Sequence, residues 1–319
     1  MTAPVCCTPV RKRLEYVSYR FLAAIVPLLP RRVMVFFARR LGYIYHLFDR
    51  RVREAGRENL ARFRPDLDAN SVLREGARLQ AVALLDALWA RKLSPKRARK
   101  YFHVSAENVA LLAGHRDKGN GIVLATAHFG SWEMMNIAAG AIGLPRATVI
   151  ARSINNPYVD RHMRAQREAT GNRIVYRDEA AMACIGALRK GEMVCSVMDM
   201  AVLPVEGGIF ADFYGLPVMT SGALPFFAHR RRAPLFFIVA TPLQKGLRYR
   251  LDATFIPIDY EADRDAEVLR ATHRMNEILQ EHIDRQPEAW IWGYKRWKWR
   301  PNEYRGPYPS YSYWVTKQY

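Results

Sequence analysis

The sequence has 319 residues, half of them apolar and a quarter charged, which is the composition of a folded protein with a sizeable core and excludes a largely disordered chain. It carries 49 Lys and Arg against 30 Asp and Glu, a formal net charge of +19. This excess predicts an anionic partner, such as nucleic acid, a membrane surface or an acidic protein. The four cysteines form no paired Cys-x-x-Cys motif, so neither a zinc site nor a disulfide scaffold is indicated, and a reduced cytoplasmic setting is expected.

The N-terminal third is predicted to be helical and amphipathic. Residues 1–12 are expected to be disordered, and residues 13–100 to form a helical region that docks on a membrane. Apolar side chains recur at three- and four-residue steps over 13–29 and 31–48, with many arginines between them. Such helices can place their apolar face in lipid while the cations meet anionic headgroups, or they can pack on the protein's own core; both alternatives stay open. No run reaches the roughly 18 apolar residues that a spanning helix needs.

The remainder, residues 101–319, is predicted to be an α/β core built on a central, mostly parallel sheet with crossover helices. From residue 121 onward, short apolar runs of the kind found in buried strands alternate with helical patterns. Two further helices, 52–63 and 69–95, precede this core. The expected strands are 121–126, 147–151, 173–176, 193–198, 234–240 and 247–255, and the expected helices are 131–141, 157–170, 179–190 and 265–285. The last helix is expected to face inward with Val268, Leu269, Met275, Leu279 and Ile283.

The segment Ala127-His128-Phe129-Gly130-Ser131-Trp132-Glu133 carries the chemistry. It follows the first strand of the core and opens a helix, which is where α/β folds place ligand sites. With Ser131 as the N-cap, Glu133 falls in the first turn, and its carboxylate can fold back to the ring of His128. A carboxylate on one ring nitrogen fixes the tautomer and leaves the other nitrogen as a base. We therefore predict His128 and Glu133 as the catalytic pair.

This segment resembles the His-x4-acidic signature of the glycerolipid acyltransferase superfamily, in the form found in the late lipid A biosynthesis acyltransferases (lauroyl and myristoyl transferases). Other motifs agree in order over roughly residues 15–305. They are Asn59-Leu60, Phe63-Arg64-Pro65, Arg152, Asn155-Asn156-Pro157, Arg164, Leu188-Arg-Lys-Gly191, Asp199, Phe210-x-x-Phe213-Tyr-Gly215, Trp290, Arg296-Trp297-Lys298 and Arg300-Pro301.

The resemblance implies direct acyl transfer from an acyl thioester to a hydroxyl, with His128 as general base and no covalent acyl-enzyme. The thioester is a co-substrate, so no cofactor is implied, and no metal is expected. The oxyanion of the intermediate is assigned to backbone N–H groups around Gly130 or to a cation such as Arg164. Arginines are candidates for phosphate recognition and Glu206 for an acceptor hydroxyl; solvated surface charges and a simple turn are the respective alternatives. The substrate-binding candidates are Gly130, Ser131, Arg152, Arg164, Arg167, Asp199 and Glu206.

The partners implied are acyl carrier protein or acyl-CoA as donor, an anionic glycolipid or phospholipid as acceptor, and the cytoplasmic face of the bacterial inner membrane. Met200 departs from the family, which commonly has Gln there, and Pro204-Val-Glu-Gly207 is similar to a motif of the glycerophosphate branch. A lysophospholipid, phosphatidylinositol mannoside or aminolipid acceptor therefore stays open. The aromatic and basic segment 290–300 suits a lipid boundary, nucleic-acid stacking or a strap that closes the acyl site. A non-catalytic nucleic-acid-binding protein is a remote alternative because no such binding motif is present.

Overall fold

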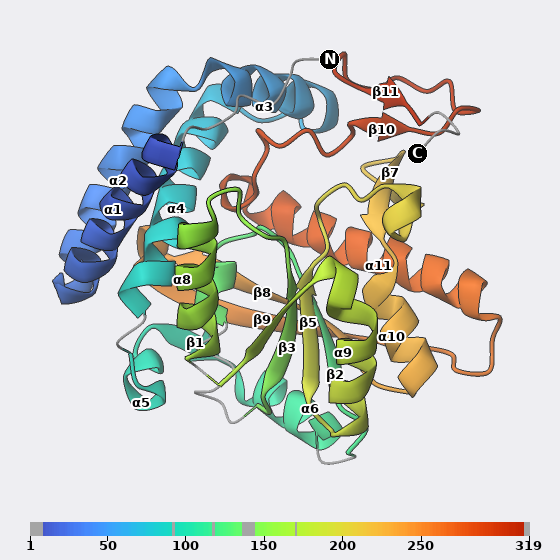
Figure 1. The fold of residues 1–319 in the computed structure, drawn as a ribbon. Coiled ribbons are helices and arrows are strands. Elements are labelled where there is room, and N and C mark those ends of the chain that lie inside the picture. The colour runs from blue at the N-terminus through green and yellow to red at the C-terminus, as the bar shows by residue number, and fades with distance from the viewer. Residues whose placement is uncertain (1–8, 91–92, 117–118, 136–143, 170, 316–319) are drawn as a thin grey trace.

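A central sheet of seven strands organises the protein, whose computed structural model describes residues 9–90, 93–116, 119–135, 144–169 and 171–315 (Figure 1). The strands are β1 (Phe102–Val104), β2 (Ile122–Thr126), β3 (Ala147–Ala151), β4 (Arg173–Tyr176), β5 (Met193–Val197), β8 (Leu235–Leu243) and β9 (Arg248–Ile256). Their order is β1-β9-β8-β2-β5-β3-β4. Every neighbouring pair is parallel except β8 with β9. The predicted mostly parallel sheet is confirmed.

Both faces of the sheet are covered by helices, as the strand sequences require. Along β2, Ile122 and Leu124 point into one apolar core, while Val123 and Ala125 point into the other. A strand that is buried on both sides has no polar face, which explains its continuous apolar run. The crossover helices are α8 (Pro157–Glu168), α9 (Arg177–Arg189) and α10 (Ala223–Arg231), and the long helix α11 (Arg264–Arg285) follows the sheet.

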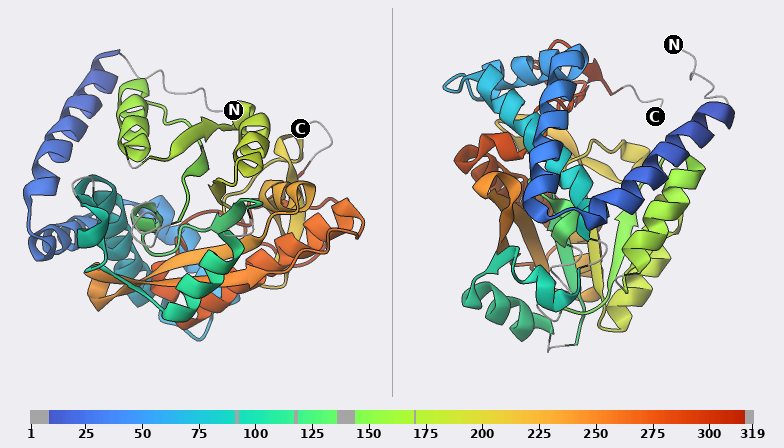
Figure 2. Two further views of the ribbon diagram at one scale, coloured as in Figure 1. Left: turned by 90° about the horizontal axis from the view of Figure 1, so that it is seen from below. Right: turned by 90° about the vertical axis from the view of Figure 1, so that its left-hand side faces the viewer.

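The N-terminal helices pack against the sheet and share both of its cores. Met34 and Val82 belong to the core on one face, and Leu60 and Leu73 belong to the core on the other. The first helix runs along the outside of the molecule, beside α8 (Figure 2). The elements of this region are α1 (Pro9–Ile25), η1 (Val26–Leu28), α2 (Arg31–Phe48), α3 (Arg50–Phe63), α4 (Ala69–Trp89), α5 (Pro95–Ala98) and α6 (Ala106–Arg116).

Polar side chains mark where several of these helices begin. Asp49 accepts a hydrogen bond from the backbone of α3, and Asp68, Asn156 and Asp263 do the same for α4, α8 and α11. Each satisfies an N–H group that the first turn leaves unpaired. The predicted first residues of these four helices, 52, 69, 157 and 265, lie within two residues of the observed ones, whereas the helix predicted over 69–95 ends at Trp89.

Several elements differ from the sequence prediction. Helix α1 begins at Pro9, so residues 9–12 are helical and not disordered; residues 1–8 lie outside the described residues. The helix predicted over 131–141 begins at residue 132, and the described residues follow it only to 135. The sequence also missed the strand β1, the helices α6 and α10, and four further strands. These are the hairpin β6 (Gly208–Phe213) with β7 (Leu216–Ser221), and the pair β10 (Trp299–Arg300) with β11 (Tyr313–Trp314).

The aromatic segment near the C-terminus is part of the core. Trp290, Trp292 and Trp297 are all fully buried, and Phe63 stacks on Trp297 at 4.0 Å between ring centroids. Asn59 donates to the carbonyl of Trp292 at 2.8 Å and so ties the segment to α3. The burial of these tryptophans favours a structural role for the segment over contact with lipid or stacking on nucleic acid. Within the described ranges, no helix combines the length and the apolar character that a bilayer-spanning segment requires.

Candidate active site

The sheet register brings His128 and Asp199 together. In the pairing of β2 with β5, Thr126 lies opposite Val197. Both strands end at this pair, and two residues further along the chain lie His128 after β2 and Asp199 after β5. Carboxyl ends of adjacent parallel strands meet at one edge of a sheet, where α/β proteins bind ligands.

Asp199 holds the imidazole ring of His128. The Nδ1 atom of His128 lies 2.8 Å from Oδ1 of Asp199, whose side chain is completely buried. The other oxygen, Oδ2, accepts the backbone N–H of His128 and the indole N–H of Trp290, both at 3.0 Å. An ionised carboxylate only accepts, so Nδ1 carries the proton and the tautomer is fixed. The sequence assigned this contact to Glu133; the structure assigns it to Asp199.

The pKa values of His128 and Asp199 are set by burial and by the charges near them. Burial lowers the pKa of the His128 imidazole, but the charge and hydrogen bond of Asp199 outweigh burial and raise this pKa above its ordinary value. Burial raises the pKa of the Asp199 carboxyl, and His128, the Trp290 hydrogen bond and Arg296 together bring it below its ordinary value. Arg296 is itself fully buried and donates to the carbonyl of Met219 at 2.5 Å. Asp199 is therefore ionised when His128 is neutral.

Glu133 makes a different contact. Both of its carboxylate oxygens accept hydrogen bonds from the guanidinium of Arg167 on α8, one of them at 3.2 Å from Nε. Glu133 acts on the ring of His128 only through space, by raising its pKa. The side chain of Glu133 is 12% exposed and that of Arg167 is 26% exposed, so this ion pair is partly shielded from water. The predicted partner of the histidine thus lies nearby but positions an arginine.

Gly130 and Ser131 shape the turn and do not face a substrate. Gly130 adopts φ = 61°, and a side chain there would collide with the carbonyl of Ala240. Its N–H donates to the carbonyl of Ala289 at 2.9 Å, so the predicted oxyanion donor is already used. The Ser131 side chain is fully buried, and its hydroxyl donates to Asp86 at 2.8 Å. Both residues were predicted to bind substrate. In the structure, their hydrogen bonds instead hold the turn that follows His128.

An apolar cavity of about 550 Å³ begins at His128. His128 retains 22% exposure of its side chain, and Trp132 packs edge-on against its ring with centroids 4.7 Å apart. The polar lining near the histidine comes from Glu133 and Arg167, together with Arg152, Arg177 and Glu206. Deeper, the cavity is lined mainly by aliphatic side chains and thioethers, including Leu124, Met135, Val149, Met193, Ile238 and Leu251.

The predicted arginines separate into two groups. Arg152 and Arg167 line the cavity. Arg164 does not line it; its guanidinium pairs with Glu168 at 3.1 Å and lies over the ring of Tyr176. Glu206 lines the cavity and also closes a turn, because it accepts the N–H of Leu203 at 3.3 Å. Its carboxylate pairs with Arg177, and this contact helps to hold the pKa of Glu206 below its ordinary value against the effect of burial.

Sequence reasoning named Trp290 and Arg296 only as parts of a motif and gave Asp199 the wrong task. Asp199 contacts the histidine from a segment 71 residues away along the chain, and Trp290 and Arg296 act on Asp199 from still further along it. The available signal was the position of Asp199, two residues after an apolar strand that resembles the strand before His128. Asp86, in the last turn of α4, lies in no motif that would have indicated its role.

Together, the α/β sheet, the carboxylate-held histidine and the long apolar cavity define the class of acyltransferase enzymes that the sequence motifs resemble. The family model "Bacterial lipid A biosynthesis acyltransferase" matches residues 10–299, so this chain belongs to that family. The chain is 26% identical over 277 residues to the "Lipid A biosynthesis palmitoleoyltransferase" of Escherichia coli (strain K12), and equally to a "Lipid A biosynthesis acyltransferase" of Shigella flexneri. Both alignments cover 86% of this chain and 87% of the relative.

A "Lipid A biosynthesis acyltransferase" of Haemophilus influenzae is 24% identical over 253 residues, which cover 77% of this chain and 78% of that protein. The chain is therefore an O-acyltransferase, and the remote alternative of a non-catalytic nucleic-acid-binding protein is wrong.

Proposed function

We propose that this protein transfers a fatty acyl chain from an acyl thioester to a hydroxyl of a lipid A-type glycolipid, with His128 as the general base. The observation that carries the proposal is the position of one imidazole. It sits at the mouth of an apolar cavity, with its Nδ1 held by a buried carboxylate and its ring partly exposed to the cavity. Membership of the lipid A biosynthesis acyltransferase family supports the acceptor.

The reaction follows from the fixed tautomer. Nε2 of His128 accepts the proton of the acceptor hydroxyl while the oxygen attacks the thioester carbon. Asp199 stabilises the imidazolium that forms, as the carboxylate does in hydrolase triads. The tetrahedral intermediate collapses, the C–S bond breaks, and the thiolate takes the proton from the imidazolium. The acyl chain passes directly to the acceptor.

Arg167 is the best placed cation for the oxyanion of the intermediate. Its guanidinium lines the cavity next to His128, and Glu133 fixes its orientation with two hydrogen bonds. This replaces the predicted donors, since the N–H of Gly130 and the side chain of Arg164 are engaged elsewhere. Arg152 and Arg177, also in the cavity lining, are the candidates for a phosphate or carboxylate of the acceptor.

The apolar part of the cavity is the proposed site for the acyl chain. Each methylene that moves from water into such a lining gains about 0.8 kcal/mol, so a fatty chain binds strongly without any polar contact. For the donor we propose acyl carrier protein, with acyl-CoA as the alternative. The net charge of +19 favours an acidic protein as the donor.

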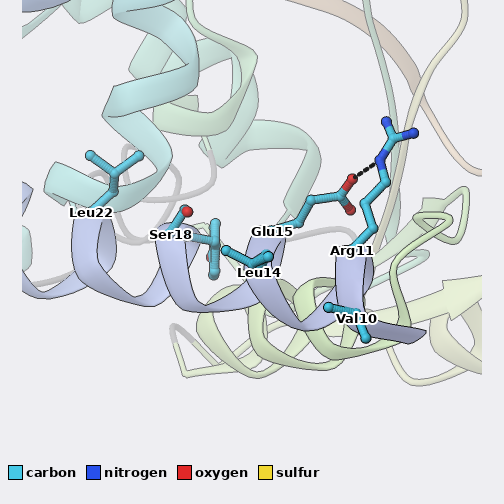
Figure 3. Close-up of a pocket in the computed structure, with 7 residues that line it drawn as sticks. Val10, Arg11, Leu14, Glu15, Ser18 and Leu22 are labelled. Carbon is cyan, nitrogen blue, oxygen red and sulfur yellow. Dashed lines mark hydrogen bonds and ion pairs between the residues drawn. The ribbon is translucent and has the colours of Figure 1, made fainter. Parts of the chain in front are cut away.

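We further propose that α1 and α2 dock on the membrane, at the cytoplasmic face of the inner membrane. Along α1, Leu14, Val17 and Phe21 are each more than 60% exposed, and the apolar side chains Val10, Leu14 and Leu22 line one open groove of this helix (Figure 3). On α2, Phe37 and Phe48 are also exposed. Of the two open alternatives, these faces support lipid contact, because packing on the protein's own core would have buried them.

The test compares wild type with His128→Ala in a purified transfer assay that uses acyl carrier protein thioester and a lipid A precursor. We expect His128→Ala to lose transfer by a factor of about 10³ or more. His103→Ala removes an exposed histidine on β1 and serves as the matched control, with activity near wild type. Near-normal transfer by His128→Ala would contradict the mechanism. Mass spectrometry of lipids from a strain that lacks the protein then identifies the acceptor, as the lipid class that loses one acyl chain.

A further inference from the structure

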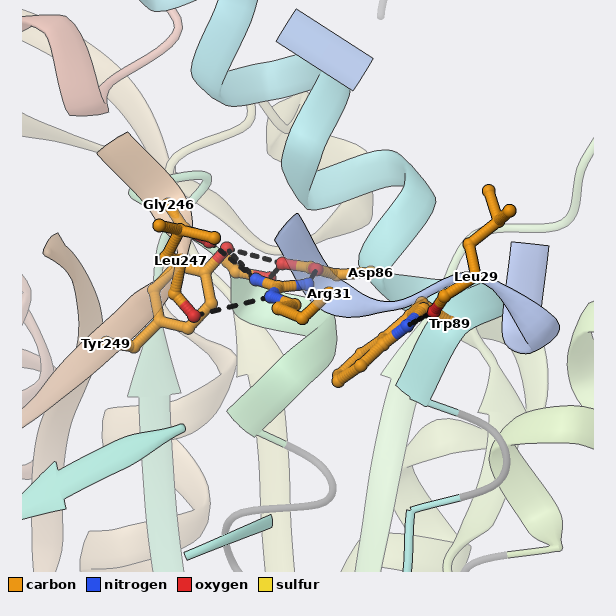
Figure 4. Close-up of polar contacts among 8 residues, drawn as sticks. Leu29, Arg31, Asp86, Trp89, Gly246, Leu247 and Tyr249 are labelled. Atoms are coloured by element: carbon orange, nitrogen blue, oxygen red, sulfur yellow. Dashed lines mark hydrogen bonds and ion pairs between the residues drawn. The ribbon is translucent and has the colours of Figure 1, made fainter. Parts of the chain in front are cut away.

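Outside the cavity, a buried polar cluster joins four segments that are far apart in the sequence, and Figure 4 labels Arg31, Asp86 and Tyr249 from three of them. Its centre is the carboxylate of Asp86 on α4, which is completely buried. Oδ1 of Asp86 accepts a hydrogen bond from Arg31, and Oδ2 accepts from Tyr249 on β9 and from Ser131. Burial of a charged group is unfavourable unless its hydrogen bonds are satisfied, and here they are.

Arg31 anchors the start of α2 in this cluster. Its guanidinium donates to the carbonyl of Gly246 at 2.5 Å and lies over the ring of Trp89, 4.8 Å from the centroid. Burial lowers the pKa of Arg31, but the Asp86 carboxylate more than compensates and raises it above its ordinary value. Other arginines of α2, such as Arg32 and Arg40, point to solvent. The first residue of α2 is thus fixed inside the protein, although the helix exposes its apolar face.

Ser131 connects the same carboxylate to the turn that carries His128. The backbone of Gly130 and that of Ser131 are held by the carbonyls of Ala289 and Ala240, at 2.9 and 3.4 Å. The side chain of Ser131 adds a third tie, to Asp86 at 2.8 Å. One carboxylate therefore contacts both the first residue of a proposed interfacial helix and the turn that positions the imidazole.

We propose that Asp86 is a positioning residue that couples the placement of α2 to the position of the His128 turn. Docking of α2 on a membrane shifts or steadies the side chain of Arg31. The hydrogen bonds of Asp86 to Arg31 and to Ser131 pass this change in position on to the turn. Replacing a buried ion pair by apolar side chains is often neutral for stability, so the cluster is better explained by specificity of geometry than by stability. The coupling to catalysis rests on the proposed function; the coupling to structure does not.

The first experiment measures transfer by Ser131→Ala, which removes one hydrogen bond and leaves the Arg31–Asp86 ion pair in place. We expect kcat to fall about tenfold with KM within twofold, because the cavity is unchanged and only the ring position is affected. The matched control is Thr272→Val, which removes another fully buried hydroxyl, on α11, that donates to the carbonyl of Val268. Equal kcat values for Ser131→Ala and Thr272→Val would overturn the positioning role.

The second experiment does not depend on the activity. Amide hydrogen exchange of residues 127–135 is followed in the full-length protein, with and without vesicles of anionic phospholipid. We expect the vesicles to slow exchange in wild type and in Thr272→Val, and to have no effect in Ser131→Ala. An unchanged exchange rate in wild type, or an equal response in Ser131→Ala, would overturn the coupling. If wild type shows the exchange effect but transfers no acyl chain, the proposed function fails and the structural coupling stands.

Discussion

Among single residues, Asp199 decides the protonation state of the site. Asp199→Asn keeps the shape but removes the charge, and the amide can present N–H to the ring and stabilise the wrong tautomer. We expect kcat to fall by about 10³–10⁴, as substitution of the carboxylate does in comparable triads. The measurement is the steady-state rate at saturating donor and acceptor. A reduction of only a few-fold would show that Asp199 is structural.

The pH dependence follows from the same pair. His128 must be neutral to act as a base, and its pKa lies above the ordinary 6.5, chiefly because Asp199 outweighs the opposing effect of burial. The rate therefore increases as pH rises through a midpoint above 6.5. With Asp199→Asn, burial remains while the raising charge is lost, so the residual activity should show a midpoint at lower pH. A midpoint that does not move would contradict the assignment of Asp199 as the ring's partner.

Glu133 is expected to act through Arg167. Glu133→Gln leaves the His128–Asp199 contact intact, so we expect a loss of roughly tenfold, smaller than that of Asp199→Asn. Arg167→Lys should give a similar loss, because an ammonium group cannot reproduce the bidentate contact that the guanidinium makes with Glu133. If the double variant is no worse than either single one, the two residues act as a unit. Fully additive losses in kcat would show that Glu133 works independently of Arg167.

Sequence proximity explains why His128 was correctly placed in the site and why its ring partner was wrongly assigned to Glu133. The box from His128 to Glu133 is contiguous, so its chemistry could be recognised, and His128 was assigned to the site. The partner of the ring, however, depends on which strand lies beside β2, and the register that sets Thr126 opposite Val197 is not visible in one sequence. The buried contacts of Ser131 and Gly130 were missed for the same reason: Asp86 and Ala289 reach them only after folding.

At the scale of helices and strands, the elements with a strong apolar periodicity were predicted, and those with a weak pattern were missed. The helix over 265–285 was placed within one residue of α11, and four of its five predicted inward positions are buried. Leu269 is the exception, at 39% exposed, because it lies at the edge of the apolar stripe. The hairpin β6–β7 was missed since its partly exposed strands lack the continuous apolar run that identified the central strands.

The exposed faces of α1 and α2 give a prediction about membrane binding. Replacing Phe21 and Phe37 by Ser removes two large exposed side chains without opening the core, so stability should change little. We expect the double variant to bind phospholipid vesicles at least tenfold more weakly in a flotation assay, since each aromatic side chain loses its transfer energy. Met182→Ser is the control, since Met182 is exposed on α9, away from these helices. Unchanged vesicle binding would mean that other surfaces dock.

The depth of the cavity gives a second prediction at this scale. Ala147, at the start of β3, and Met193, at the start of β5, line the cavity far from the carboxyl ends of the strands where His128 lies. Ala147→Phe should shorten the space for the acyl chain and shift the preference toward shorter donors. The check is competition between donors of different chain length. The same preference in wild type and variant would place the acyl chain elsewhere.

For the molecule as a whole, the net charge separates the two candidate donors. A surface with a net charge of +19 attracts an acidic carrier protein from a distance and speeds its encounter, whereas it acts on acyl-CoA mainly at the site itself. Raising the salt from about 0.05 to 0.5 M shortens the screening length to a few ångströms. We therefore expect kcat/KM with acyl carrier protein thioester to fall at least tenfold, with kcat nearly constant, because the chemistry occurs in a shielded cavity. The decline with acyl-CoA should be smaller, and an equal decline for both donors would show that the surface charge serves the membrane and not the carrier.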